Sequence, residues 1–139
     1  MLFWQQGFEA TTIEEVTEQT GVNASSIFAA YGNKYGLFVA ALARYRAEVG
    51  ARLSMLEHGK RGLDDLVSFI GWLTEINTSG RQPFGCLMVN TMVEFGNAEQ
   101  SVLEQVALYR QQLTDAIRAA LMRASEMNEI PNTTVATRT

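Results

Sequence analysis

Two long segments of the chain repeat apolar residues at steps of three and four, which is the spacing of one face of an α-helix. The first segment runs from Lys34 to Glu57, and the second runs from Glu99 to about Met127. No part of the sequence alternates apolar and polar residues between hairpin turns, as half-buried strands do. The pattern therefore predicts an all-α fold in which these two helices supply much of the core.

Glycine, asparagine and proline divide the rest of the chain into shorter helical segments. Thr12-Ile13-Glu14-Glu15 fits the capping-box pattern, and Asn23 is a favourable N-cap for the segment that follows it. We expect a polar connector over residues 78–85, around Pro83, and a frayed tail beyond Glu129. The shorter predicted helices cover residues 1–6, 12–20, 24–31, 63–77 and 86–95.

Composition indicates that the protein forms a hydrophobic core and also indicates the cellular compartment in which it is expected. Hydrophobic residues make up 47% of the 139 residues and charged residues 19%, so extensive disorder is not expected. The chain has one cysteine, no apolar run long enough for a bilayer and no signal-peptide pattern at its start. We therefore expect a cytoplasmic protein without a membrane partner.

The net charge of −4 argues mildly against a nucleic-acid partner, because phosphate binding needs local cations. A small DNA-reading head on an acidic body is nevertheless compatible with this balance.

The chain does not have the residue clusters of an enzyme. Its single histidine, His58, lies in a loop of lysine, arginine and glycine, where it is expected to be solvated. Neither a metal-ligand spacing nor a phosphate-binding glycine loop is present. The carboxylate pairs Glu14-Glu15 and Asp64-Asp65 stand at helix starts, where they favour the helix dipole. We expect a non-enzymatic protein with no cofactor and no metal.

Two short predicted helices meet at Gly21-Val22-Asn23 in a helix-turn-helix pattern. Gly21 permits the backbone of a tight turn, and Val22 is expected to plug that turn with an apolar side chain. In DNA-binding proteins of this pattern the second helix lies in the major groove and its first residues, here 24–26, face base edges. Ordinary helical bundles also contain such pairs, so spacing alone leaves DNA binding open.

A series of spaced motifs surrounds this helix pair and resembles the head of the TetR/AcrR transcriptional regulators. A later stretch, Phe84 to Thr91, resembles the sixth helix of one subgroup of that family. The resemblance thus extends from Phe3 to about Met127. The motifs of the head are Gly7-Phe8-Glu9-Ala10-Thr11-Thr12-Ile13, Thr20-Gly21-Val22-Asn23, Ser26-Ile27-Phe28, Tyr31-Gly32-Asn33-Lys34 and Leu37-Phe38.

The resemblance implies a helix-turn-helix, three-helix head over residues 1–46, joined to a helical ligand-binding and dimerisation body over residues 47–139. In the head it assigns phosphate contacts to Thr12 and Lys34. Phe28 occupies a position where a tyrosine often donates to phosphate, a contact that a phenyl ring lacks. The residues that it implies at the DNA are Thr12, Ala24, Ser25, Ser26, Phe28 and Lys34.

The body of this family encloses a pocket for a small molecule, and ligand pockets are mostly apolar. Apolar stripes on helices are, however, more often plain core than pocket. Cys86 in particular could be a thiol sensor, but a lone cysteine beside Leu87, Met88 and Val89 is more often a buried hydrophobe. The candidate pocket residues are Met55, Trp72, Cys86, Asn90 and Tyr109.

The expected function is that of a transcriptional regulator, specifically a repressor that a small apolar effector releases from a double-stranded DNA operator. The full-length product is expected to act as a homodimer. Compared with the family pattern, the chain is expected to be truncated at both ends: it lacks the basic start of the first helix and the closing helices of the dimer. The alternative is a truncated helical ligand- or protein-binding module that does not bind DNA.

Overall fold

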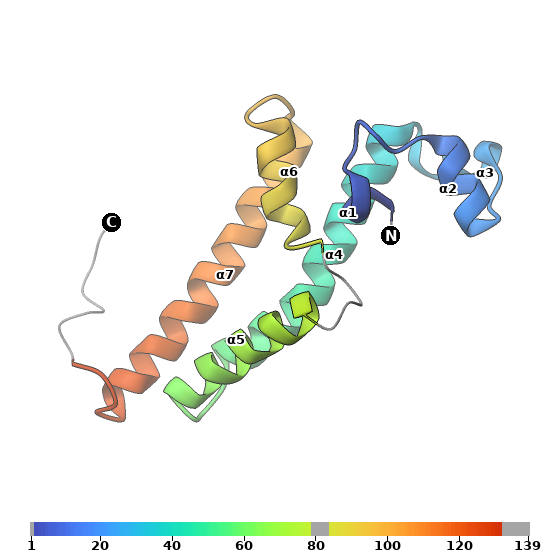
Figure 1. Ribbon diagram of the computed structural model, residues 1–139. Helices are drawn as coiled ribbons and strands as arrows, with labels where there is room; N and C mark the ends of the chain where they lie inside the picture. The colour runs from blue at the N-terminus through green and yellow to red at the C-terminus, as the bar shows by residue number, and fades with distance from the viewer. Residues whose placement is uncertain (1, 79–83, 132–139) are drawn as a thin grey trace. The chain divides into compact units, whose positions relative to one another are not determined.

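The computed structural model describes residues 2–78 and 84–131, the side chains of 76–78 excepted. All regular structure within these ranges is α-helical, which confirms the all-α prediction (Figure 1). The helices of this part of the chain are α1 Leu2–Gln6, α2 Ile13–Thr20, α3 Ala24–Tyr31, α4 Lys34–Glu57, α5 Leu63–Thr78, α6 Leu87–Phe95 and α7 Gln100–Glu126.

The helix bounds differ from the predicted ones by about one residue. Helix α5 continues to Thr78, α6 begins after Cys86 rather than at it, and α7 begins at Gln100. Offsets of this size are ordinary, because terminal turns fray and share their hydrogen bonds with caps. The rest of the predicted connector, residues 79–83, and the predicted tail from residue 132 lie outside the described residues.

The chain divides into two compact units, each built from two separate stretches of sequence. Unit 1 comprises Met1–Ala47 and Phe84–Ala107, and unit 2 comprises Glu48–Pro83 and Leu108–Thr139. Residues 84–107, expected in the body, therefore pack with the residues of the expected head. The functional division at residue 46 concerns roles rather than packing and stays a prediction.

Aromatic side chains form the centre of unit 1. Phe38 of α4 is 1% exposed, and its ring centroid lies 5.1 Å from that of Phe3, 5.2 Å from that of Phe8 and 5.3 Å from that of Phe95. Aromatic pairs at such distances contribute about 0.5–1.5 kcal/mol each beyond the area that they bury. This cluster fixes α1, α4, α6 and the 7–9 loop relative to one another.

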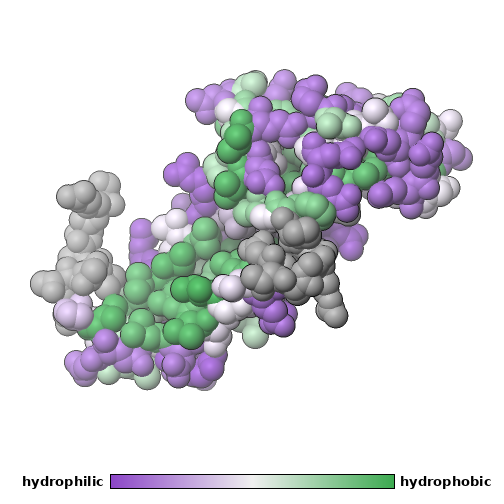
Figure 2. All heavy atoms as spheres, in the orientation of Figure 1, coloured by the Kyte–Doolittle hydropathy of each residue, from purple (hydrophilic) through white to green (hydrophobic). Residues whose placement is uncertain are grey.

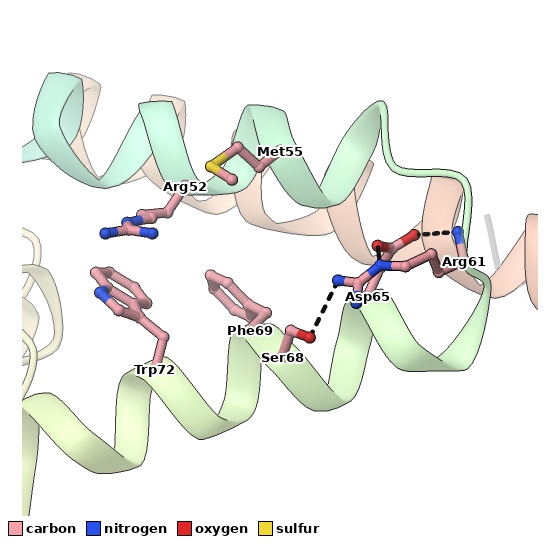
Figure 3. Close-up of a pocket in the computed structure, with 7 residues that line it drawn as sticks. All are labelled: Arg52, Met55, Arg61, Asp65, Ser68, Phe69 and Trp72. Carbon is pink, nitrogen blue, oxygen red and sulfur yellow. Dashed lines mark hydrogen bonds and ion pairs between the residues drawn. The ribbon is translucent and has the colours of Figure 1, made fainter.

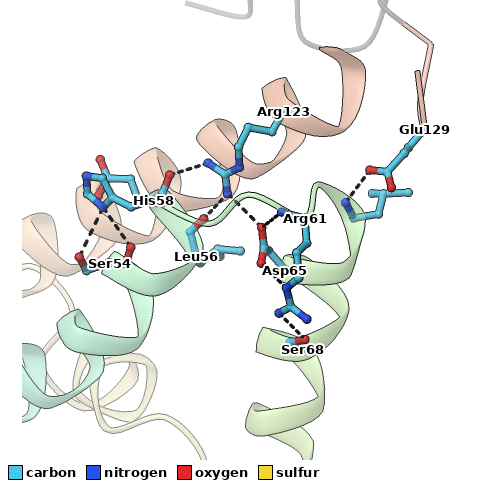
Figure 4. A network of polar contacts seen from close by, with 10 residues as sticks. Ser54, Leu56, His58, Arg61, Asp65, Ser68, Arg123 and Glu129 are labelled. Atoms are coloured by element: carbon cyan, nitrogen blue, oxygen red, sulfur yellow. Dashed lines mark hydrogen bonds and ion pairs between the residues drawn. The ribbon is translucent and has the colours of Figure 1, made fainter. Parts of the chain in front are cut away.

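Unit 2 has a polar network at the end of α4 (Figure 4). Arg123 of α7 donates to the backbone carbonyls of Leu56 and Glu57, which have no partner inside the helix. The buried carboxylate of Asp65 accepts from the backbone N–H and from Nε of Arg61, at 2.8 and 3.1 Å, and lies 3.7 Å from Arg123. Asp65 and Arg123 thereby join the start of α5, the end of α4 and α7.

Apolar side chains also reach the surface of unit 2, where they gather over α5 and α7 (Figure 2). On α5, Val67, Ile70 and Leu73 are 67%, 59% and 38% exposed. An apolar surface of this kind usually marks a face that contacts another molecule.

Candidate nucleic-acid interface and ligand pocket

Helix α2 begins with the capping box that its sequence predicts. The backbone N–H of Glu15 donates to the Thr12 hydroxyl at 3.2 Å, and the backbone N–H of Thr12 donates to the Glu15 carboxylate at 2.9 Å. Gln6 of α1 donates to the same carboxylate at 3.0 Å. Thr12 is therefore exposed but held in place, with its hydroxyl at the N-terminus of α2.

The turn between α2 and α3 is built from backbone geometry rather than from packing. Gly21 has φ 71°, and its N–H donates to the Thr17 carbonyl at 2.9 Å. Asn23 caps α3 by accepting from the Ser26 N–H at 2.8 Å. The prediction that Val22 plugs the turn is wrong: its side chain is 45% exposed, because the whole 21–23 connection lies on the surface.

Helix α3 rests on the unit through one buried residue and presents its other faces to solvent. Ile27 is 4% exposed, whereas Ser25 and Ser26 are exposed and Ala24 is half-buried. Phe28 is 45% exposed, although a phenyl ring favours burial. Small side chains at the start of α3 allow its backbone to approach another surface closely, as a helix in a DNA groove must.

Lys34 opens α4 and is held by the loop between α1 and α2. Its Nζ donates to the Phe8 carbonyl at 2.9 Å and lies 4.2 Å from the centre of the Phe8 ring. An ammonium has three N–H donors, so this contact leaves donors for a phosphate. The six residues predicted at the DNA all belong to unit 1, but no observation of the structure tests their roles.

A second contact fixes the same loop, and sequence reasoning missed it. The carboxylate of Glu94 in α6 accepts from the N–H of Phe8 at 3.0 Å and from the N–H of Glu9 at 2.9 Å. Gly7 precedes these amides with φ 82°, and a Cβ at this position would lie 2.9 Å from a Glu94 oxygen. We call Glu94 with the backbone of residues 7–9 the Glu94 clamp. Gly7 is the one feature of the clamp that can be recognised in the sequence, where the glycine pattern indicates only the end of the first helix.

The surface beside the Glu94 clamp is hollowed but acidic. Phe8, Glu9, Glu94 and Glu99 line this hollow, together with Tyr35. Three carboxylates repel a phosphate backbone. DNA is therefore not expected to bind in this hollow.

A groove of about 130 Å³ lies in unit 2 between α4 and α5 (Figure 3). Two of the five predicted pocket residues, Met55 and Trp72, line it. Arg52, Phe69 and the Arg61–Asp65 pair complete most of its walls, and the sequence analysis did not predict them as pocket residues. A role in ligand binding stays a prediction for Met55 and Trp72.

The other three predicted pocket residues do not line this groove. Cys86 is half-buried and its Sγ accepts from the Tyr45 hydroxyl at 3.5 Å, whereas Asn90 donates to the Phe84 carbonyl at 2.7 Å. Tyr109 is 9% exposed and belongs to the core. Cys86 and Asn90 thus shape the chain around the start of α6.

The single histidine lies at the surface of unit 2. His58 is exposed, and its Nδ1 lies 3.0 Å from the Ser54 carbonyl. Among the described residues, no group of three or more His, Cys, Asp or Glu side chains could hold a metal ion. Within the same ranges, no helix is both long and apolar enough to cross a membrane.

Comparison with known proteins gives two family matches that together cover most of the chain. Residues 1–41 match the family model of bacterial regulatory proteins, tetR family, and residues 62–138 match that of the tetracyclin repressor-like C-terminal domain. No solved structure gives a significant match.

Three curated relatives show the same relationship. The HTH-type transcriptional repressor ComR of Escherichia coli (strain K12) is 35% identical over 91 residues, which are 64% of this chain and 43% of ComR. The HTH-type transcriptional repressor BdcR of the same strain is 47% identical over 45 residues, or 32% of this chain and 23% of BdcR. The uncharacterized HTH-type transcriptional regulator YezE of Bacillus subtilis (strain 168) is 24% identical over 133 residues, or 93% of this chain and 67% of YezE. The alignments thus span less than half the length of the first two relatives.

Proposed function

Because the chain belongs to the TetR family of bacterial regulatory proteins, we propose that it acts as a DNA-binding transcriptional repressor that a small-molecule effector releases from its operator. The observation that carries the proposal is helix α3, which is anchored by Ile27 and exposes Ser25 and Ser26 at its start. The names of ComR and BdcR support repression rather than activation. The proposed site of action is the bacterial cytoplasm.

In this proposal, α3 lies in the major groove. Ser25 and Ser26 contact base edges, and Ala24 lets the start of the helix approach them. Phe28 offers an apolar contact, for example with a thymine methyl group. Thr12 and Lys34 contact phosphates from the N-termini of α2 and α4, where the helix dipole also favours an anion.

The proposed interface carries few positive charges. Residues 1–46 contain Lys34, Arg44 and Arg46 against four glutamates, and Arg46 already donates to Gln105 at 3.1 Å. Because affinity for DNA grows with the number of neutralised phosphates, one head of this kind binds weakly. We therefore propose a homodimer whose two heads contact half-sites about one helical turn apart, or a multiple of it.

The proposed effector site is the groove of unit 2. Helix α4 carries two of its lining residues, Arg52 and Met55, and begins with Lys34 at the proposed DNA interface. A ligand that binds one conformation of α4 more tightly than another shifts the population of heads that fit the operator. The switch is thereby assigned to a single continuous helix.

The proposal is tested by selecting duplexes that residues 1–139 bind from a random pool at low salt, and then titrating them at several salt concentrations. Lys34→Ala is expected to weaken binding to all sequences and to lower the salt slope by about one, whereas Ser25→Ala changes the preferred sequence. Arg110→Ala removes an exposed cation of α7 and serves as the control, with no effect on either property. If neither head variant changes binding, or no sequence is selected, the chain is a helical module that does not bind DNA through this head.

A further inference from the structure

The groove between α4 and α5 has apolar walls made of flat or flexible side chains. Met55 lies on the α4 side, and Phe69 and Trp72 point toward it from successive turns of α5 (Figure 3). The rings of Phe69 and Trp72 lie 5.8 Å apart at an interplanar angle of 33°. Such walls suit a flat ring, which gains contact with aromatic side chains and with a flexible thioether.

A cation stands over this apolar floor. The guanidinium carbon of Arg52 lies 5.3 Å from the centre of the Trp72 ring. No carboxylate pairs with Arg52 among the described residues. A guanidinium that stacks on a ring keeps its N–H groups directed outward in its own plane, where they match both oxygens of a carboxylate. Within the described part of the chain, the Arg52 guanidinium thus has no carboxylate partner.

The other end of the groove cannot neutralise that cation. Asp65 is its one lining carboxylate, and it already accepts from Arg61 and lies 3.7 Å from Arg123. Arg61 is occupied as well, since it donates to Ser68 at 3.1 Å. Two arginines against one aspartate leave the lining with a net charge of +1. The free positive charge lies on Arg52.

The groove has room for about one ring. Its volume is about 130 Å³, and an apolar cavity of roughly 150 Å³ holds one benzene molecule. Larger ligand pockets span about 300–1,000 Å³.

We infer that the groove binds a single-ring aromatic carboxylate, with the carboxylate on Arg52 and the ring between Met55 and the Trp72 and Phe69 side chains. This refines the expectation of an apolar effector, because the ligand is apolar in its ring and anionic at its edge. The inference rests on the proposed function only where it makes this ligand the effector. Binding itself is a property of the groove.

The test is a titration of residues 1–139 with benzoate. Binding is monitored through the NMR signal of the Trp72 indole N–H, and a Trp72→Phe variant assigns this signal. Benzamide has nearly the same shape without the charge, and benzylamine reverses the charge. Because a hydrogen bond to a charged group exceeds a neutral one by about a factor of ten in binding, benzamide is expected to bind at least roughly tenfold more weakly than benzoate. Benzylamine is expected not to bind.

Matched variants test whether the positive charge that binds the carboxylate belongs to Arg52. Arg52→Gln, at an exposed position, is expected to weaken benzoate at least roughly tenfold while leaving benzamide unchanged. Arg110→Ala removes another exposed arginine of unit 2 and is expected to leave both ligands unchanged. Equal binding of benzoate and benzamide, equal loss in both arginine variants, or no benzoate binding would each overturn the inference.

A parallel DNA titration separates this inference from the proposed function. Benzoate binding that weakens DNA binding supports both. Benzoate binding at Trp72 without an effect on DNA binding supports the groove as a ligand site and refutes its role as the effector site. DNA binding without any benzoate binding overturns the inference that the groove binds an aromatic carboxylate, and it leaves the DNA-binding proposal intact.

Discussion

Replacing Gly7 with alanine should show how much the Glu94 clamp contributes to the free energy of unfolding. Alanine at a positive φ costs about 1–2 kcal/mol, and Gly7 has φ 82°. Its Cβ would also lie 2.9 and 3.0 Å from the two carboxylate oxygens of Glu94. The carboxylate must therefore move away from the amides of Phe8 and Glu9.

The magnitude follows from a comparison with Gly21. That residue has φ 71°, but a Cβ there meets no atom within 4 Å, so Gly21→Ala incurs the backbone cost alone. Gly7→Ala additionally loses two hydrogen bonds, which are exposed and therefore contribute about 0.5 kcal/mol each. We expect Gly7→Ala to lower the free energy of unfolding by about 2–3 kcal/mol, roughly 1 kcal/mol more than Gly21→Ala.

The assay is a double-mutant cycle measured by urea unfolding. Glu94→Ala removes the acceptor, so Gly7→Ala in that background incurs only the backbone cost. The two substitutions should therefore be non-additive by about 1 kcal/mol, while Gly21→Ala and Glu94→Ala should add within about 0.5 kcal/mol. Additive costs for Gly7 and Glu94 would refute the reasoning, because the clamp would then contribute nothing to stability.

Substitutions in three other parts of the fold provide further tests, each by the free energy of urea unfolding. Phe38→Ala should cost about 3–5 kcal/mol, since a ring that is 1% exposed leaves a cavity in the aromatic cluster; a loss below 1 kcal/mol would contradict that packing. Asn23→Ala should cost about 1 kcal/mol by removing the cap of α3, and Asn23→Asp should restore most of it. Asp65→Ala should cost about 1–3 kcal/mol because its charged hydrogen bonds to Arg61 are lost, whereas Arg61→Ala at the exposed partner should cost less.

The helices were predictable because their signals are local. A cap such as Thr12 or Asn23 acts on amides within the same turn, and Gly21 sets the backbone at its own position. The apolar spacing of α4 and α7 likewise lies within one helix. These signals fixed the all-α class and placed most helix ends within a residue.

The candidate site depended on contacts that no local pattern encodes. Glu94 meets an amide 86 residues earlier in the chain, and nothing in α6 distinguishes this glutamate from a solvated one. Arg52 likewise resembled an ordinary polar-face residue of α4 until α5 brought Trp72 beneath it. Val22 shows the opposite error, since an apolar residue in a turn was expected to be covered and is exposed.

The central claim is that DNA binds to α3 and the start of α4. It is tested most directly by following the backbone amide signals of isotope-labelled residues 1–139 while a selected duplex is added. We expect the amides of residues 24–28 and of Lys34 to shift together and saturate, while those around Trp72 in α5 stay unchanged. Shifts confined to α5 and α7, or spread evenly over the chain, would contradict the claim.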